Sequence, residues 1–293
     1  MAFLVRPRAA AACEAGTTLY PLVRRGEREP VTFKADSVFT SLEDVAKERW
    51  DQVWLCVPAT ALDEGWLLAI AGAVGEALVV ALPPGLDSEP RIRRAFPGDR
   101  VVPGLIGIMS YQAPLPGEEV PRPGIAYFFP PGSPTAFGGP HAVAVAGALR
   151  AGGCPAVTKR DVATTSVFGS CVLMPVVAAL EAAGWSFAEL RRGPLLTLAA
   201  EASREAMGIA SARLGVRAPL FGYLVRGWIL GLVLALAPRL VPFELEAFLR
   251  HHFTKVGDQT RLLLGEYCRD GEARGLGTLA LGSLANKLKA LPA

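Results

Sequence analysis

The sequence predicts an α/β half followed by an all-α half. In the first half, short apolar runs that end in proline or glycine alternate with helical periods. From about Arg160 onward the pattern changes to long helical periods rich in alanine and leucine, and no further strand is expected. Gly152 and Gly153 lie near this change. We therefore expect two domains, with residues 1–157 in the first and residues 158–293 in the second.

The first half is expected to build a parallel sheet. A continuous apolar run from Val53 to Val57 is followed by a helix through Trp66 to Ala73 and by a second run from Ala77 to Leu82. A third run extends from Val101 to Met109. Strands that are joined by a helix in this way pair in parallel. Shorter strands are expected at 31–33, 37–39 and 125–129, with a helix capped by Ser41 after the second of these.

Composition and charge argue against several classes of partner. The 30 basic and 27 acidic residues are spread along the whole chain, so no basic stripe suggests binding to nucleic acid. The five cysteines show no C-x-x-C spacing, which favours a reduced, cytoplasmic protein. His251, His252 and Cys268 do not have the spacing of metal ligands, because adjacent helical residues point about 100° apart. We expect no metal site.

No membrane partner is expected either. The opening of the chain is interrupted by arginines and does not read as a signal peptide. The most membrane-like stretch, Gly227 to Pro238, holds about a dozen uncharged residues, whereas a span needs roughly 20. We interpret it as a buried helix. The apolar residues from Trp228 to Leu236 can be buried within the domain or against a second copy of the chain. The sequence does not distinguish between the two, so a homodimer is a possible assembly.

The opening segment is similar to the second strand of a nucleotide-binding α/β fold. In that fold a first strand, a G-x-G-x-x-G turn and a helix precede a second strand, whose end meets the adenosine ribose. Arg6 and Arg8 lie where a residue that binds the 2′-phosphate of the ribose would be expected. The alternative is that both arginines only flank a buried apolar run. The first strand and its turn do not precede Met1, so we expect an incomplete domain.

This missing strand poses a physical problem, because it is central in such a sheet and its neighbours would lose their partners. Three explanations are open. They are that an upstream segment of about two dozen residues belongs before this start, that the sheet closes differently, and that the chain is a relic. We favour the first explanation.

In the order of its parts the chain resembles the ketopantoate reductase (2-dehydropantoate 2-reductase) family, truncated at the N-terminus. These are NADPH-dependent enzymes with an N-terminal Rossmann domain, a helical C-terminal domain of the 6-phosphogluconate dehydrogenase type, and an active site between the two. The resemblance covers nearly the whole chain. It rests on Leu4-Val5-Arg6, on the strand-plus-turn units that end at Pro58 and at Gly85-Leu86, on the helix with Cys171 to Pro175, and on Thr254-Lys255-Val256-Gly257.

The chain departs from the family at its catalytic positions. Ser166 stands where the resemblance implies a catalytic lysine, and Ser170 and Met174 replace asparagines on the same helix face, which is expected to line a cleft. Other positions that contact cofactor or substrate in the family have also changed. A lysine corresponds to Pro58, an asparagine to Pro84, an acid to Lys255 and a serine to Phe243.

Candidate site residues follow from these positions. We expect Arg6, Arg8, Pro58, Pro84 and Gly85 to lie in the NADP-binding region.

Lys255, with His252 beside it, is the candidate for a relocated proton donor or an anion contact. If the segment is helical, His252, Lys255 and Gln259 share one face, while Phe253, Val256, Thr260 and Leu263 pack inward; the alternative is a solvated face. Ser166 and Ser170 are candidates to hydrogen-bond a substrate carbonyl, although helical serines usually bond their own backbone.

The expected function is that of an NADP-dependent oxidoreductase with an altered small-molecule substrate. Reduction of a keto acid needs a general acid and groups that hold the carboxylate, and the family's groups for both are replaced. We therefore do not expect ketopantoate to be the substrate. The alternative is a cofactor-free binding or scaffold protein that keeps the two-domain shell. A pericyclase or isomerase that reuses the cleft is a third class, which no residue specifically supports.

Overall fold

A computed structural model describes residues 1–26 and 28–290 of the chain. Contacts divide the chain into two units, each with its own core. Unit 1 holds Met1–Val57, Ala61–Leu82 and Pro90–Val162. Unit 2 holds Ala163–Ala293 and two short loops, Pro58–Thr60 and Pro83–Glu89, which leave strands of unit 1 but pack with the helices of unit 2. The helical part thus begins at the end of the α/β part, and it also includes two of the loops.

The largest sheet of unit 1 has five strands in the order β11-β10-β7-β6-β5. Its three strands β5, β6 and β7 pair in parallel, as the strand, helix, strand pattern predicted. Strand β10 is antiparallel to β7, and β11 is parallel to β10. The strands are β5 (Gln52–Leu55), β6 (Leu78–Ala81), β7 (Val101–Leu105), β10 (Thr135–Phe137) and β11 (Ala156–Thr158).

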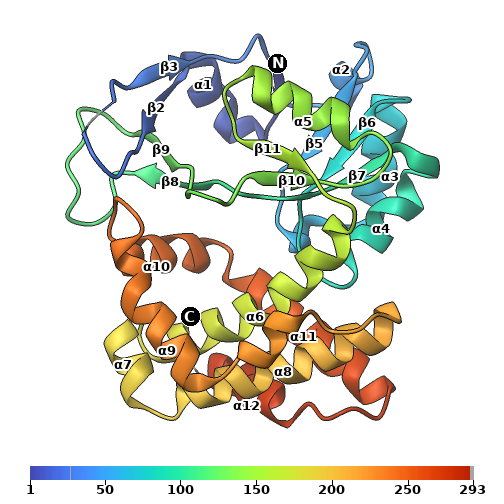
Figure 1. Cartoon of the computed structure of the whole chain (residues 1–293). Coiled ribbons are helices and arrows are strands. Elements are labelled where there is room, and N and C mark those ends of the chain that lie inside the picture. Colours follow the sequence, from blue (N-terminus) through green and yellow to red (C-terminus); the bar gives the residue numbers. More distant parts are fainter. Residues whose placement is uncertain (27, 291–293) are drawn as a thin grey trace. The chain divides into compact units, whose positions relative to one another are not determined.

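Helices cover both faces of this sheet, because alternate residues of a strand point to opposite sides. Val79 packs in a core cluster with residues of α3 (Glu64–Val74) and α4 (Ser88–Ala95). Val80, the next residue, packs in a second cluster with residues of α5 (Ala142–Ala151). Figure 1 shows α5 beside β10 and β11. Unit 1 is therefore a three-layer α/β arrangement.

The opening strand does not join this sheet. Strand β1 (Ala2–Leu4) pairs in parallel with β4 (Ser37–Phe39) in a separate two-stranded sheet, and β5 is the edge of the five-stranded one. Helix α1 (Pro7–Ala15) follows β1. No strand of the described residues pairs with both β1 and β5, so the expected neighbours of the missing first strand have no common partner here.

A third sheet has the order β3-β2-β9-β8, with β2 parallel to β9 and antiparallel pairing elsewhere. The apolar run that was expected from 101 to 109 divides between β7 and β8. Between them Gly107 lies so close to the backbone of Ser133 and Pro134 that no side chain fits, and its N–H donates to Oγ1 of Thr135 over 3.0 Å. The strands are β2 (Thr17–Pro21), β3 (Val31–Phe33), β8 (Met109–Ala113) and β9 (Gly124–Phe128).

Unit 2 contains only helices among the described residues after Ala163. Helices α8, α11 and α12 pack on one another. Helix α6 is long and apolar enough to cross a membrane, but 56% of its apolar stretch is buried within the protein, as in a core helix. The helices are α6 (Val162–Ala182), α7 (Phe187–Arg192), α8 (Leu195–Leu214), α9 (Gly227–Leu236), α10 (Leu245–Lys255), α11 (Gly257–Ala273) and α12 (Leu279–Lys289), with short 3₁₀ turns at Leu220–Leu224 and Ala237–Arg239.

Local sequence signals explain where the shorter elements begin. Helix α2 (Leu42–Val45) starts after Ser41, whose Oγ accepts from the N–H of Asp44 over 3.2 Å, as the expected serine cap. The side chain of Asp63 caps α3 by accepting from the N–H of Trp66. The strands that were expected at 31–33 and 37–39 have these bounds in the structure.

A glycine in the third sheet gives a test of its packing. A Cβ added to Gly124 would collide with the carbonyl oxygen of Thr18 and lie 2.8 Å from Cε2 of Tyr20. Gly124→Ala should therefore lower the free energy of unfolding by about 1–3 kcal/mol, measured by urea unfolding. Gly72→Ala in α3, where nothing lies within 4 Å, is the control and should raise it by about 0.5–1 kcal/mol. Equal effects of the two substitutions would contradict the close approach.

Candidate functional site

Three of the expected cofactor positions lie in the two loops that pack with unit 2. Pro58 belongs to the loop Pro58–Thr60, and Pro84 and Gly85 belong to the loop Pro83–Glu89. The loops follow the carboxyl ends of β5 and β6, which is the edge of an open α/β sheet where ligands commonly bind. Both loops contact helix α11.

The first loop is held by a side chain of α11. The amide oxygen Oε1 of Gln259 accepts from the backbone N–H of Ala59 over 2.7 Å. Ala59 is buried, so this N–H needs a partner within the protein. Pro58, beside it, is exposed. Gln259 therefore supports the loop, a role that the sequence alone did not suggest.

The second loop is pressed against the same helix at Gly85. This residue is buried and has a φ of +118°, a conformation that favours glycine. A Cβ here would collide with Cδ2 of Leu263 and would lie 3.3 Å from Oε2 of Glu266. Within the turn, Oγ of Ser88 donates to the carbonyl of Pro84 over 2.6 Å. The loop is thus ordered by contacts with protein groups.

An arginine of α8 joins the second loop to α11 through two carboxylates. Nη2 of Arg213 is bonded to Asp87, and its Nη1 donates to Asp270 over 2.8 Å. Nε of Arg274 also donates to Asp270, over 2.9 Å. Burial works to raise the pKa of Asp270, but the hydrogen bonds from Arg274 and Arg213 outweigh it and the pKa lies below its usual value of 3.8.

Ser170 lies inside unit 2. Its side chain is only 4% exposed, and its Oγ donates to the carbonyl of Val167 over 2.9 Å and lies 2.6 Å from the hydroxyl of Tyr267. Burial raises the pKa of Tyr267 well above its usual value, and the neighbouring Cys171 adds to the shift. Burial also raises the pKa of the Cys171 thiol to about 12. The hydroxyl of Ser170 is engaged within the protein, and it bonds its own helix as the alternative interpretation held.

The other residues of that helix face do not form an exposed polar row. Met174 is buried, whereas Ser166, two turns before it, is half-buried. Ser166 is therefore the more accessible of the two serines that were candidates for a contact with substrate.

Lys255 is exposed at the last position of α10. The ring of His252, one turn earlier, stacks on Phe248 at 5.7 Å and meets Phe253 edge-on at 5.0 Å. Partial burial of this ring lowers the pKa of His252, and the charges of Lys255 and His251 lower it further. A neutral imidazole thus lies near the Lys255 ammonium.

One expectation for this segment is wrong. Helix α10 ends at Lys255 and α11 begins at Gly257, with Val256 between them at φ −117° and ψ 25°. His252 and Lys255 therefore do not share a helix face with Gln259, which bonds the first loop instead. The inward side of the prediction is confirmed for Phe253, Thr260 and Leu263, which are buried, while Val256 is half-buried.

Arg6 and Arg8 are exposed where β1 passes into α1. Arg6 is the residue before the first turn of α1, Pro7 occupies the first helical position, and no side chain caps this end. Two cations at an uncapped helix N-terminus suit an anionic group. Among the described residues no G-x-G-x-x-G turn joins a strand to a helix, so the fit to a dinucleotide rests on these two arginines.

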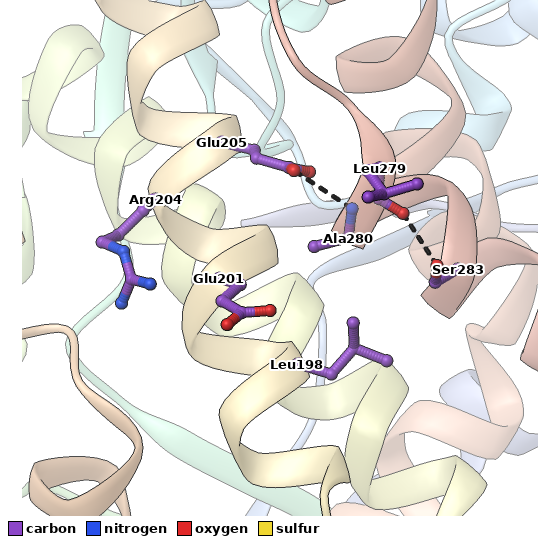
Figure 2. Close-up of a pocket in the computed structure, with 7 residues that line it drawn as sticks. All are labelled: Leu198, Glu201, Arg204, Glu205, Leu279, Ala280 and Ser283. Carbon is purple, nitrogen blue, oxygen red and sulfur yellow. Dashed lines mark hydrogen bonds between the residues drawn. The ribbon is translucent and has the colours of Figure 1, made fainter.

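A glycine motif that the sequence analysis missed has another role. Gly275-Leu-Gly-Thr-Leu-Ala280 has the G-x-G-x-x-G/A spacing and opens helix α12, but it follows helix α11 and no strand. The carboxylate of Glu205 accepts from the N–H group of Ala280 over 3.0 Å (Figure 2) and from that of Leu281 over 2.9 Å. The helix N-terminus is therefore occupied by a side chain of the protein, and the spacing alone is misleading here.

The same carboxylate borders a cavity of about 370 Å³ between α8 and α12 (Figure 2). Arg204, on its rim, donates to the carbonyl of Val225 over 2.9 Å. The polar groups of Glu205 and Arg204 are thus engaged in supporting the fold. The cavity is lined by Leu198, Glu201, Arg204, Glu205, Leu279, Ala280 and Ser283.

Comparison with solved structures shows a fold shared over nearly the whole chain. A ketopantoate reductase of the PanE/ApbA family from Ralstonia eutropha superimposes with a TM-score of 0.72 and 19% identity, covering 98% of this chain and 89% of that one. The ternary structure of D-mandelate dehydrogenase with NADH and anilino(oxo)acetate superimposes with a TM-score of 0.71 and 14% identity, covering 99% of this chain and 89% of that one. A 2-dehydropantoate 2-reductase from Porphyromonas gingivalis superimposes with a TM-score of 0.66 and 15% identity, covering 99% of this chain and 88% of that one.

The class of protein follows from this likeness. The chain has the two-domain fold of the ketopantoate reductases, with a mixed α/β part that contains parallel strands and a helical C-terminal part, and D-mandelate dehydrogenase shares that fold. No protein-family model matches the sequence. No curated protein matches it either. At this level of identity the likeness defines the fold, while activity has to be argued from the site.

The burial of Ser170 predicts a stability effect that can be separated from any effect on binding. Ser170→Ala deprives the buried Tyr267 hydroxyl of a partner and should lower the free energy of unfolding by about 1–3 kcal/mol. Tyr267→Phe should also destabilise the protein. The double variant should lose less stability than the sum of the losses in the two single variants, because it removes both partners of the bond together. Thermal and urea unfolding measure these changes, and strictly additive losses would contradict the bond.

The Arg213 bridge predicts a pH dependence. Because the pKa of Asp270 is depressed in the folded protein, its contribution to stability is present above 3.8 and is lost as the pH falls through the folded pKa. Arg213→Gln should lower the free energy of unfolding by about 1–3 kcal/mol near neutral pH, and the difference from the parent should shrink in acid. Urea unfolding across this pH range measures it. Arg192→Gln, which breaks an exposed pair with Glu189, is the control and should change little.

Proposed function

We propose that this chain is an NADP-dependent oxidoreductase of the ketopantoate reductase type that acts on a small molecule other than ketopantoate. The observation that carries the proposal is the position of Arg6 and Arg8 at the end of β1, in a chain that has the fold of these enzymes over 98% of its length. Fold alone does not specify an activity, so the argument depends on which groups can meet the cofactor and the substrate.

The two arginines support NADP over NAD. The two cofactors differ by the 2′-phosphate on the adenosine ribose, and arginine binds phosphate through paired, charge-assisted hydrogen bonds. Exposed guanidinium groups at the end of β1 stand where the second strand of such a domain meets that ribose. A bound nicotinamide supplies or accepts the hydride. The residues of this chain have to bind the nucleotide and manage the proton.

The proposed proton donor is Lys255. It is the exposed cation of the α10 end, and the pKa of the neighbouring His252 is lowered, so that His252 stays neutral and adds little repulsion. Protonation of a substrate oxygen as hydride arrives requires a group of this kind. Ser166, half-buried on α6, is the proposed hydrogen-bond donor to the same oxygen. A keto acid would also need a group that holds its carboxylate, and the family positions for it hold Pro58 and Pro84, which supports a different substrate.

The test is a titration of the 293-residue chain with NADPH and with NADH, in which binding is followed by the fluorescence of the nucleotide. Arg6→Gln/Arg8→Gln should weaken NADPH binding by about tenfold to a hundredfold, through the lost contacts with phosphate, and should leave NADH binding unchanged. Arg49→Gln, an exposed arginine of the same unit, is the control for net charge. Equal weakening of both nucleotides would overturn the assignment of the 2′-phosphate to these arginines.

A second candidate is a cofactor-free binding protein that keeps the two-domain shell. It is favoured by one specific observation, namely that the loops Pro58–Thr60 and Pro83–Glu89 are held by α11, with Leu263 at the place where a Cβ of Gly85 would lie. If a folded sample binds neither nucleotide, this candidate replaces the first. A screen of small molecules by thermal shift then looks for ligands, and comparison of the parent with Lys255→Ala tests whether Lys255 contributes to the ligand site.

A further inference from the structure

An apolar surface of unit 2 has no role in the proposed chemistry. It is formed by the segment 220–240, which comprises the turn Leu220–Leu224, helix α9 and the turn Ala237–Arg239. Leu220, Tyr223 and Trp228 are 83%, 75% and 72% exposed. Isolated apolar side chains on a surface are normal, but a run of large ones within one segment indicates an interaction surface.

Helix α9 is apolar on the side that faces water as well as on the side that faces the protein. Its inner side packs on α8, where a Cβ at Gly231 would lie 3.3 Å from Leu196, and Leu234 is buried. Its outer side carries Trp228, Leu232 and Leu236, spaced by four residues and each about half exposed or more. A surface helix in water normally has a polar outer face. The outer face of α9 therefore suits an apolar environment.

The charged residues between positions 206 and 243 are all of one sign. No aspartate or glutamate occurs from residue 206 to residue 243, whereas four arginines do. Three of them, Arg217, Arg226 and Arg239, are exposed and bracket the exposed apolar side chains. A two-fold contact with a second copy would bring these arginines together without a carboxylate from the segment. Charge complementarity instead favours an anionic partner with an apolar interior.

We propose that segment 220–240 binds the surface of a bilayer that contains anionic phospholipid, with α9 lying in the plane of the interface. The apolar stretch Gly227–Arg239 is too short to span a bilayer, but its leucines suit the boundary of the acyl chains. Trp228 and Tyr223 are of the residue types enriched at that boundary, and the arginines reach the phosphate groups. The sequence predicted no membrane partner because it showed no signal peptide and no stretch long enough to span a bilayer, and this proposal departs from that prediction.

Flotation of the 293-residue chain with vesicles tests the proposal. Vesicles of phosphatidylcholine with about 30% phosphatidylserine should carry the protein, and vesicles of phosphatidylcholine alone should carry much less. Trp228→Ser/Leu232→Ser should lower the partition coefficient by about tenfold through the lost apolar contact. Arg217→Gln/Arg226→Gln should lower it by about fivefold for each arginine, and high salt should have a similar effect.

Matched variants of unit 1 provide the controls. Leu68→Ser/Val143→Ser removes two exposed apolar side chains, and Arg49→Gln/Arg94→Gln removes two exposed arginines. Both should float like the parent, and circular dichroism checks that every variant is folded. The proposal is overturned if the parent does not float, or if it floats equally with both kinds of vesicle. It is also overturned if light scattering shows a dimer that Trp228→Ser/Leu232→Ser dissociates, since a second copy then covers the segment.

Discussion

The packing of α11 against the loops Pro58–Thr60 and Pro83–Glu89 is the constraint on which the rest of unit 2 depends. Four residues of α11 meet the loops or the bridge to them, and their spacing of four, three and four places them on one face of the helix. They are Gln259, Leu263, Glu266 and Asp270. Another side of the same helix is buried in the helical core, where Tyr267 meets Ser170. One helix therefore organises both the core and the loops.

This arrangement changes what the loop positions can do. Prolines at 58 and 84 have no backbone N–H, so they offer a ligand no amide donor and no side-chain polar group. The nearest backbone N–H, that of Ala59, is already bonded to Gln259. Pro58 and Pro84 therefore contribute no hydrogen-bond donor to a ligand at this edge, and Lys255 and Ser166 are the accessible candidates in unit 2. In the proposed function the chemistry therefore lies on the helices and not in the loops.

The apolar segment 220–240 and the proposed redox site make separate demands on unit 2. The site requires ordered groups such as those held by α11, while the segment presents apolar side chains that contribute little to the core apart from Val225 and Leu234. Water opposes such exposure, and an anionic bilayer surface would relieve it.

The sequence by itself determined the α/β and all-α halves, the parallel pairing of β5, β6 and β7, and the local cap at Ser41. These features depend on periodicity and on hydrogen bonds between near neighbours, which a sequence displays directly. It also indicated Arg6 and Arg8 as cations at the end of a strand.

Only the tertiary structure decided the rest. It separated β1 and β4 from the five-stranded sheet, broke the helix at Val256, and buried the hydroxyl of Ser170 against Tyr267. It also assigned Gln259 to a backbone N–H that lies 200 positions away in the sequence. The physical reason is that sheet membership, burial and polar pairing are set by contacts between segments far apart in the chain, and no local pattern records which partner each group will meet.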